Sequence, residues 1–407
     1  MPPVDELRQR IQSLAESVFR QREILRDLEQ QYCAAQTELN ASLDPMAARL
    51  PFELSSDILR QSLPNPTAWE SVMALVGVSR AWRDIALVTP SLWSSISDQG
   101  IRPSKFPELL DIWVIRSRNC PISPSLRHTT STTFNNIFVV LEKHANRVEK
   151  LDLWFRANYH VVDYPLVALK SLTIDGEAFK EKWVLPVPAI LRLLRNAPNL
   201  VEFNFLCPEL TAWEYATTLT HSNLRHIRLG RFDNHRYRYS GTNLLRRLGL
   251  PSLGTLSICG DAGDVGDWFQ TCCPPLHSLR IYMGWGIDPT FFSNFLGSGI
   301  TNLELICPET RRSILDVLSA SPDLFPDLRN FVVLESVGRI SHWQQHVLTF
   351  LATPRGRQTL ESLRLKVPQD CYDKYVTVGF VEAVRYESGL IRVTLESADD
   401  YCESYAT

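Results

Sequence analysis

The sequence of this chain lacks the motifs that would predict a chemical activity. It contains no G-x-S-x-G motif, no phosphate-binding loop and no dinucleotide fingerprint. No His or Cys pair has the spacing of zinc ligands, and Asp261, Asp264 and Asp267 lack the bidentate glutamate that ends a calcium-binding loop. We expect these aspartates in a loop after a strand. The sequence therefore predicts a protein that is not an enzyme and has no catalytic residue, metal site or cofactor.

Disulfides, strong charge and long apolar runs are missing as well. The nine cysteines include no C-x-x-C pair, which favours free thiols in a reducing compartment. The formal net charge of −3 argues against nucleic acid or a membrane surface as the partner. No apolar run reaches the roughly 18 residues that span a bilayer, and the first residues do not resemble a secretory signal. We expect a soluble protein of the cytoplasm or the nucleus.

The chain instead begins with a sustained seven-residue repeat, which predicts a coiled-coil helix over residues 5–42. The repeat positions alternate at spacings of four and three residues: Leu7, Ile11, Leu14, Val18, Gln21, Leu25, Leu28, Tyr32, Ala35 and Leu39. Gln21 would be a polar residue that fixes the register. The pattern favours a homodimer through residues 7–39 or pairing with a partner helix. The alternative is a long helix folded back onto the rest of the protein.

Apolar spacing and capping residues predict three short helices over residues 46–97. The first begins at Pro51, and its apolar residues Leu54, Ile58 and Leu59 form one face. A second helix begins near Trp69, and Ser79 is placed to cap a third that ends before Pro90. So short a unit exposes more apolar surface than it can bury alone, which favours a protein partner.

Twelve residues of this segment follow one pattern in order: Leu50, Pro51, Glu53, Leu54, Ile58, Leu59, Val78, Arg80, Trp82, Arg83, Leu92 and Trp93. In this pattern the segment resembles the F-box family. The passage after it, with Trp113, Arg116-Ser117 and Pro121-Ile122-Ser123, resembles fungal F-box proteins. Ser79 departs from the family pattern, where a cysteine is common. The resemblance implies docking onto the Skp-type adaptor of a cullin-based ubiquitin ligase. The residues that would contact the adaptor are Leu50, Pro51, Leu54, Ile58, Leu59, Leu75, Val78 and Trp82.

After a linker helix and first cap at residues 98–146, one short pattern recurs over residues 147–397. It is L-x-x-L-x-L, found ten times from Val148/Leu151/Leu153 to Leu390/Val393/Leu395 at intervals of 21 to 32 residues. This is the strand pattern of a leucine-rich repeat, and amphipathic helical segments lie between several copies. The fold class predicted is therefore α/β: an irregular solenoid with short parallel strands on its concave side. An ordinary α/β sheet domain is the alternative for this region. We expect residues 398–407 to form an acidic tail.

The residues between the apolar positions of each strand should project from the concave face. Candidates for binding a target protein are His226, Arg228, Arg280, Tyr282 and Arg364, with Trp154 and Trp285 as aromatic anchors. One segment concentrates arginines and tyrosines: Arg225, Arg228, Arg231, Arg236, Tyr237, Arg238, Tyr239, Arg246 and Arg247. This composition is typical of a solvated loop, of a binding site for an acidic or phosphorylated peptide, or of a contact with nucleic acid. Together these features predict a non-enzymatic substrate receptor; the alternative is a repeat scaffold that never meets a ligase.

Overall fold

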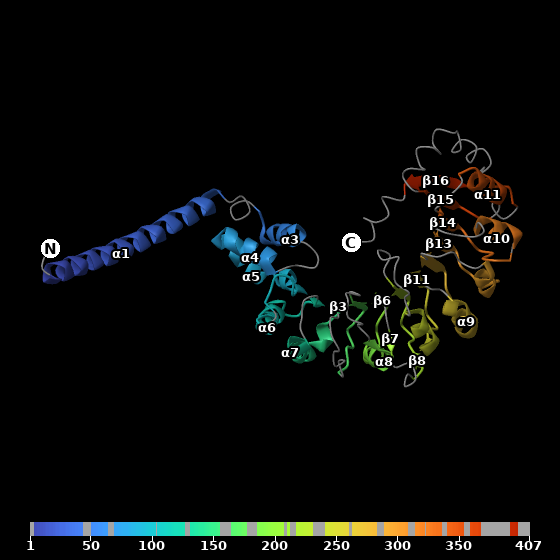
Figure 1. Ribbon diagram of the computed structural model, residues 1–407, viewed down its shortest axis with the longest axis horizontal. Coiled ribbons are helices and arrows are strands. Elements are labelled where there is room, and N and C mark those ends of the chain that lie inside the picture. Colours follow the sequence, from blue (N-terminus) through green and yellow to red (C-terminus); the bar gives the residue numbers. More distant parts are fainter. Residues whose placement is uncertain are drawn as a thin grey trace. The chain divides into compact units, whose positions relative to one another are not determined.

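The computed structural model describes most of the chain (Figure 1). The described residues are 4–43, 50–63, 69–102, 104–126, 131–154, 164–176, 185–206, 210–211, 217–230, 241–259, 263–282, 289–307, 314–321, 323–335, 340–353, 359–367 and 391–397. The chain divides into unit 1, Met1–Ile101 with Asp111–Cys120, and unit 2, Arg102–Leu110 with Pro121–Thr407. No helix in the described ranges is long and apolar enough to cross a membrane. The expected acidic tail at residues 398–407 lies outside those ranges.

Unit 1 begins with the long helix that the seven-residue repeat predicts. Helix α1 spans Val4–Leu43, and of its side chains that the structure describes only Thr37 is half-buried, while the others are exposed. Glycine and proline, the residues that interrupt helices, are absent between its two ends. The helix is therefore confirmed, and its apolar positions face solvent.

Three short helices follow in unit 1 where the sequence predicts them. They are α3 (Phe52–Ser62), α4 (Trp69–Val78) and α5 (Arg80–Val88), with the 3-10 helix η1 (Pro90–Trp93) directly after α5. The Ser79 side chain accepts a hydrogen bond from the Trp82 backbone N–H at 3.2 Å, which confirms it as the N-cap of α5.

The core of unit 1 is built on Trp93. Its ring is fully buried, its Nε1 donates to the Ala86 carbonyl at 2.8 Å, and it meets the Trp113 ring edge-to-face at 5.5 Å. The Arg116 guanidinium lies over the same ring, 4.5 Å from its centroid. Arg83 joins two of the helices, because its Nε donates to the Val76 carbonyl of α4 at 3.2 Å.

The main sheet has twelve strands that follow one another in chain order. Their bounds are β1 Ser95–Ser97, β2 Ser123–Leu126, β3 Lys150–Trp154, β4 Ser171–Asp175, β6 Glu202–Phe205, β9 His226–Leu229, β11 Thr255–Cys259, β12 Ser278–Tyr282, β13 Asn302–Cys307, β14 Asn330–Glu335, β15 Ser362–Val367 and β16 Arg392–Ser397. Every neighbouring pair from β2 to β16 is parallel. Each of the ten L-x-x-L-x-L copies forms one of the strands from β3 to β16, so the predicted parallel sheet is confirmed.

Helices connect many of these strands. Their bounds are α6 Phe106–Arg116, α7 Ser131–Glu142, η2 Ala145–Arg147, α8 Val187–Asn196, η4 Gly241–Arg247, α9 Gly263–Cys272, η5 Pro289–Phe295, α10 Ile314–Ala320 and α11 Ile340–Ala352. Figure 1 shows that within unit 2 the helices from α7 to α11 lie along the outer side of an arc and the strands along its inner side. Two short strand pairs, β5 (Leu185–Pro186) with β7 (Leu210–Thr211) and β8 (Leu219–Thr220) with β10 (Leu248–Gly249), complete the unit.

One local expectation was wrong. Asp264 and Asp267 lie in helix α9, not in a loop, because the segment from Gly263 places Val265 and Trp268 on a buried helical face. Asp261 lies outside the described ranges.

Asparagines just before two strand motifs join adjacent repeats. The Asn199 side chain donates to the Val167 carbonyl at 2.8 Å, and the Asn223 side chain donates to the Pro198 carbonyl at 2.9 Å. Both asparagines directly precede the first leucine of a motif, and both acceptors lie two residues before the equivalent leucine of the previous repeat. Such bonds satisfy backbone carbonyls that no strand pairing reaches.

Candidate protein-binding surfaces

The first candidate surface is an exposed apolar stripe on α3. Leu54 and Ile58 lie one helical turn apart and are 53% and 46% exposed. Pro51, at the start of α3, is exposed as well, and Leu50 is at the border of exposure. We call Leu50, Pro51, Leu54 and Ile58 the α3 stripe. Two leucine or isoleucine side chains left in water on one turn form a surface suited to a protein partner.

The other predicted adaptor contacts differ in accessibility. Leu59 is completely buried, so it packs inside unit 1 and offers no contact surface. With Ser55, also buried, it forms the inward stripe of α3, roughly 100° around the helix from Ile58. Leu75 and Trp82 are half-buried, whereas Val78 is exposed. The prediction that Leu59 touches the adaptor directly is thus not supported by its position.

Sequence reasoning missed four further exposed apolar residues in α3, α4 and α5: Phe52, Met73, Leu87 and Val88. Phe52 belongs to α3 and Met73 to α4, two of the three helices that carry the predicted contacts. Spacing could have indicated the exposure of Met73, which lies roughly 100° around α4 from the buried Val72. It could not have done so for Phe52, which has the spacing of the buried Ser55 and Leu59 but is the first residue of α3. These residues enlarge the apolar surface beyond the motif itself.

The second candidate surface is the inner sheet face of unit 2, which strand pairing arranges in rows. One row runs across ten strands near their first residues and is polar throughout: Lys150, Ser171, Glu202, His226, Thr255, Ser278, Asn302, Asn330, Ser362 and Arg392. A second row, two residues further along, is Asp152, Thr173, Asn204, Arg228, Ser257, Arg280, Glu304, Val332, Arg364 and Thr394. The inner sheet face is therefore predominantly polar.

Ion pairs cross this face between neighbouring strands. The Arg280 Nε lies 3.2 Å from a Glu304 carboxylate oxygen, and the Arg364 Nε lies 3.8 Å from one of Glu396. At the other end of the sheet, the Ser171 hydroxyl donates to Glu202 at 3.2 Å. Because both signs of charge occur along the rows, the face does not present a field of one sign.

All the predicted target-binding residues lie on strands of this face, and all but one are accessible there. His226, Arg280 and Arg364 are exposed, and Arg228 is half-buried. Tyr282 is only 7% exposed, so its ring is not offered to a partner as expected. It belongs to a third row with Cys259 and Ile306, both buried too, at the ends of the strands. Of the two proposed aromatic anchors, Trp154 is half-buried and Trp285 lies outside the described ranges.

Lys366 lies at the polar end of this third row, beside Glu396 on the next strand. Burial lowers the pKa of its ammonium, and Glu304 and Glu396 partly oppose that effect. Arg364 and Arg280 add to the lowering because they carry like charge. Side chains from β12, β13, β15 and β16 thus act on one lysine.

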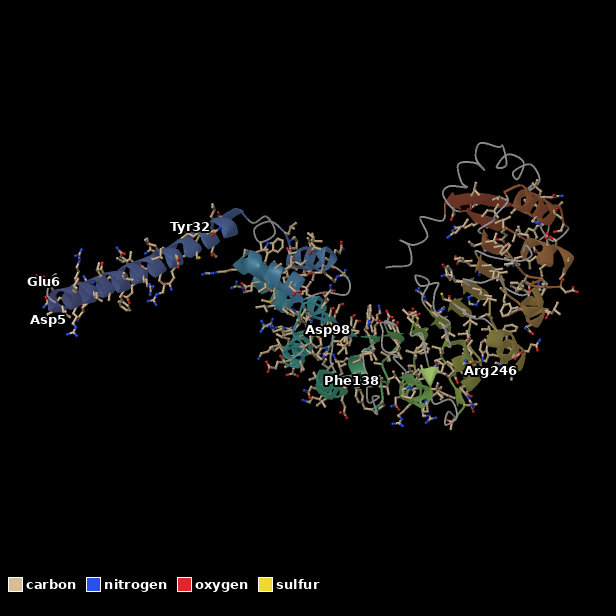
Figure 2. All side chains as sticks on the ribbon, viewed as in Figure 1. Asp5, Glu6, Tyr32, Asp98, Phe138 and Arg246 are labelled. Atoms are coloured by element: carbon tan, nitrogen blue, oxygen red, sulfur yellow. The ribbon has the colours of Figure 1, made fainter. Side chains whose placement is uncertain are left out.

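The arginine- and tyrosine-rich segment does not form one surface in the part of it that the structure describes. Arg228 lies on β9 of the inner sheet face, whereas Arg246 lies on η4, where Figure 2 labels it. Arg246 pairs with Asp267 of α9 at 3.8 Å. Residues 231–240 lie outside the described ranges, so the rest of the segment is not placed. The described arginines are therefore distributed over a strand and a helix.

The described residues contain no group of three or more His, Cys, Asp or Glu side chains that could hold a metal ion. The chain matches no protein-family model. Comparison with curated proteins also gives no match. The functional argument thus depends on the two surfaces themselves.

Proposed function

We propose that this chain is the substrate-recognition subunit of a cullin-based ubiquitin ligase. Residues 46–97 are an F-box that docks a Skp-type adaptor, and residues 147–397 are an irregular leucine-rich-repeat solenoid whose inner sheet face holds a target protein. The protein acts in the cytoplasm or the nucleus, and nucleic acid and membranes are not its partners. Catalysis belongs to the other ligase subunits, and this chain contributes proximity between target and ubiquitin carrier.

The observation that carries the proposal is that α3 has an exposed apolar stripe in addition to its buried one. Ser55 and Leu59 face inward, while Leu54 and Ile58 face solvent although isoleucine and leucine are usually buried. A helix that needs only the inward stripe to pack has no internal use for the second one. Pro51, Glu53 and Leu54 of the F-box pattern belong to the same segment, so motif and exposure coincide.

The inner sheet face supports the target-binding half of the proposal. Its first and second rows are polar in all but one position, Val332. The cross-strand pair Arg280–Glu304 fixes charged groups in defined positions. Arginine side chains held in this way suit directional hydrogen bonds to acidic or polar groups of a protein. The side chains that we expect to contact the target are His226, Arg228, Arg280 and Arg364.

The adaptor half is tested by co-expressing the full chain with the Skp-type adaptor and separating the mixture by size. We expect co-elution, and we expect Ile58→Asp to abolish it because a carboxylate would be buried in an apolar interface. Leu50→Ala with Pro51→Ala should weaken co-elution in the same way. Val139→Asp is the matched control: Val139 is 56% exposed on α7 of unit 2, outside the F-box.

Circular dichroism of each variant establishes that it is folded before its elution is interpreted. Separate elution of a folded wild-type chain and the adaptor would reject the ligase proposal. It would favour the second candidate, a leucine-rich-repeat interaction scaffold outside any ligase. The exposed apolar side chains of α1 are the observation that favours this candidate, because they provide an assembly surface independent of the F-box.

A further inference from the structure

Helix α1 carries the largest run of exposed apolar side chains in the described chain. Leu14 is 58% exposed, Leu25 is 56% exposed and Tyr32 is 67% exposed, and Figure 2 shows Tyr32 projecting from the helix. The other exposed apolar residues of the seam are Leu7, Ile11, Val18, Leu28 and Leu39. A helix of 40 residues whose described side chains are nearly all exposed is stabilised mainly by whatever covers its apolar face.

The seam assigns each residue a heptad position. In the usual lettering, the a positions are Ile11, Val18, Leu25, Tyr32 and Leu39. The d positions are Leu7, Leu14, Gln21, Leu28 and Ala35. Apart from the polar Gln21, the first half of the seam thus has medium-sized apolar residues, whereas the second half has both the largest residue, Tyr32, and the smallest, Ala35. This asymmetry means that the two possible orientations of a second copy give different cores.

A parallel pair in register would place every seam residue against itself. Tyr32 would face Tyr32 in one layer and Ala35 would face Ala35 in the next, so an overfilled layer would adjoin an underfilled one. In an antiparallel pair that overlaps the whole seam, each a residue faces a d residue so that their numbers sum to 46. Tyr32 then faces Leu14, Ala35 faces Ile11, and Gln21 faces Leu25. The large and small side chains are distributed over separate layers.

The flanking e and g positions also differ between the halves of the helix. Arg8, Arg10 and Arg22 occupy them in the first half, and Glu29 and Glu38 in the second. In the parallel pair, Arg10 would lie near Ala15 and Glu29 near Ile24, and no opposite charges meet. In the antiparallel pair, Arg10 of each copy lies beside Glu38 of the other. The structure records no ion pair from Arg10 or Glu38 to another described residue.

Two further contacts form at the centre of the antiparallel pair. Ile24, a g residue that is 60% exposed and outside the seam, lies against Ile24 of the second copy and extends the apolar contact. Arg22 lies near its own copy at the solvent-exposed e positions, where water screens the repulsion. The intrahelical pair Arg20–Glu16, at 3.9 Å, is outside the seam and does not compete with the dimer contacts.

We propose that α1 joins two copies of this chain as an antiparallel two-stranded coiled coil over residues 7–39. Apolar layers hold the pair together, and the two Arg10–Glu38 contacts select its orientation, because exposed ion pairs are individually weak. The inference does not depend on the F-box, since α1 lies outside residues 46–97. A receptor with such a helix would present two target-binding faces.

The first test is the mass of the purified full chain by light scattering over a range of concentrations. We expect a dimer, a monomer for Leu14→Asp, and a dimer for Phe19→Asp. Phe19 is the matched control because it is 64% exposed, close to the 58% of Leu14, but lies outside the seam. A monomeric wild-type chain, or equal loss of the dimer in both variants, would overturn the proposal.

The second test decides the orientation by chemical crosslinking in a Cys33→Ser background. Ile24→Cys should be joined to its copy by a short bifunctional thiol reagent. Leu14→Cys should not, because its copy lies 18 residues away along the axis, about 27 Å. The reverse pattern would establish a parallel pair and reject the proposed geometry. The parent Cys33→Ser chain controls for the other native cysteines.

Charge exchange provides an independent check of the same geometry. Glu38→Arg should weaken the dimer about tenfold, since it replaces two attractive contacts by two repulsive ones. Adding Arg10→Glu to the same chain should restore most of the affinity. Failure of this restoration would contradict the Arg10–Glu38 contact. Adaptor co-elution measured on the same variants should be unchanged, so a failure here is distinguishable from a failure of the ligase proposal.

Discussion

Gly230 lies at the end of β9 in a backbone conformation that other residues rarely adopt. Its φ is +84°, and an added Cβ would lie 2.4 Å from the backbone carbonyl oxygen of Cys259. Its N–H donates to the Phe205 carbonyl at 2.8 Å. Because both the conformation and the space are restricted by backbone atoms, no side-chain rearrangement can make room for a larger residue.

We therefore expect Gly230→Ala to destabilise unit 2 markedly. The positive φ alone costs about 1–2 kcal/mol for alanine, and the backbone contact adds to that. Gly297→Ala is the control, since Gly297 also has a positive φ of +69° but has no atom within 4 Å of its added Cβ. Thermal unfolding followed by circular dichroism should show the larger fall in melting temperature for Gly230→Ala. Equal falls would mean that conformation, and not the contact with Cys259, sets the cost.

At the scale of the element, apolar spacing predicts which side chains enter the core but not always which stripe of a helix does. Leu54, Ile58 and Leu59 were predicted as one face, yet only Leu59 is buried. Ile58 and Leu59 are adjacent, so they point in directions roughly 100° apart, and the contacts of α3 with α5 and η1 select the inward one. The prediction for Tyr282 was wrong for a different reason. Strand alternation places its side chain on the inner sheet face, but alternation does not indicate what packs over the end of a strand.

The charged side chains of neighbouring strands give a prediction for Lys366. Its pKa is lowered from 10.5, first by burial, while Glu304 raises it and Arg280 lowers it. Between the lowered value and 10.5 the unfolded chain binds more protons, so the contribution of Lys366 to stability rises with pH in that window. Amine labelling of Lys366 at increasing alkaline pH should therefore reach its midpoint below 10.5.

Two variants check the sign of these charge effects. Glu304→Gln should move the labelling midpoint of Lys366 further down, because it removes a charge that stabilises the ammonium. Arg280→Gln should move it up, because it removes a like charge. Midpoints that stay unchanged in both variants would show that burial alone perturbs this lysine.

At the scale of the whole molecule, the order of the sheet could be predicted from sequence, whereas its first strands could not. Ten equally patterned segments that cannot bury their own faces favour stacking in chain order, and the strands from β3 to β16 follow it. The pattern is absent in Ser95–Ser97 and in Ser123–Leu126, so it predicts neither β1 nor β2. The α3 stripe was recognisable only through its family resemblance, because spacing alone does not distinguish a contact surface from a core.

A sheet whose strands contact only their chain neighbours should respond locally to damage. Leu151 on β3 and Leu365 on β15 are core leucines of the repeated motif near opposite ends of the sheet, and both are 1% exposed or less. Replacing either by alanine removes buried contacts worth roughly 2–5 kcal/mol. In a stacked array that loss passes mainly to adjacent repeats, since each repeat is stabilised by its nearest neighbours.

We therefore expect Leu365→Ala to raise amide hydrogen exchange about 30-fold in β14–β16 and to leave β3 and β4 unchanged, with the reverse for Leu151→Ala. Mass spectrometry of peptides from the full chain resolves the two ends, and each variant is the control for the other. A uniform rise across the whole sheet in either variant would instead mean that unit 2 unfolds as one cooperative body, as an ordinary α/β domain does.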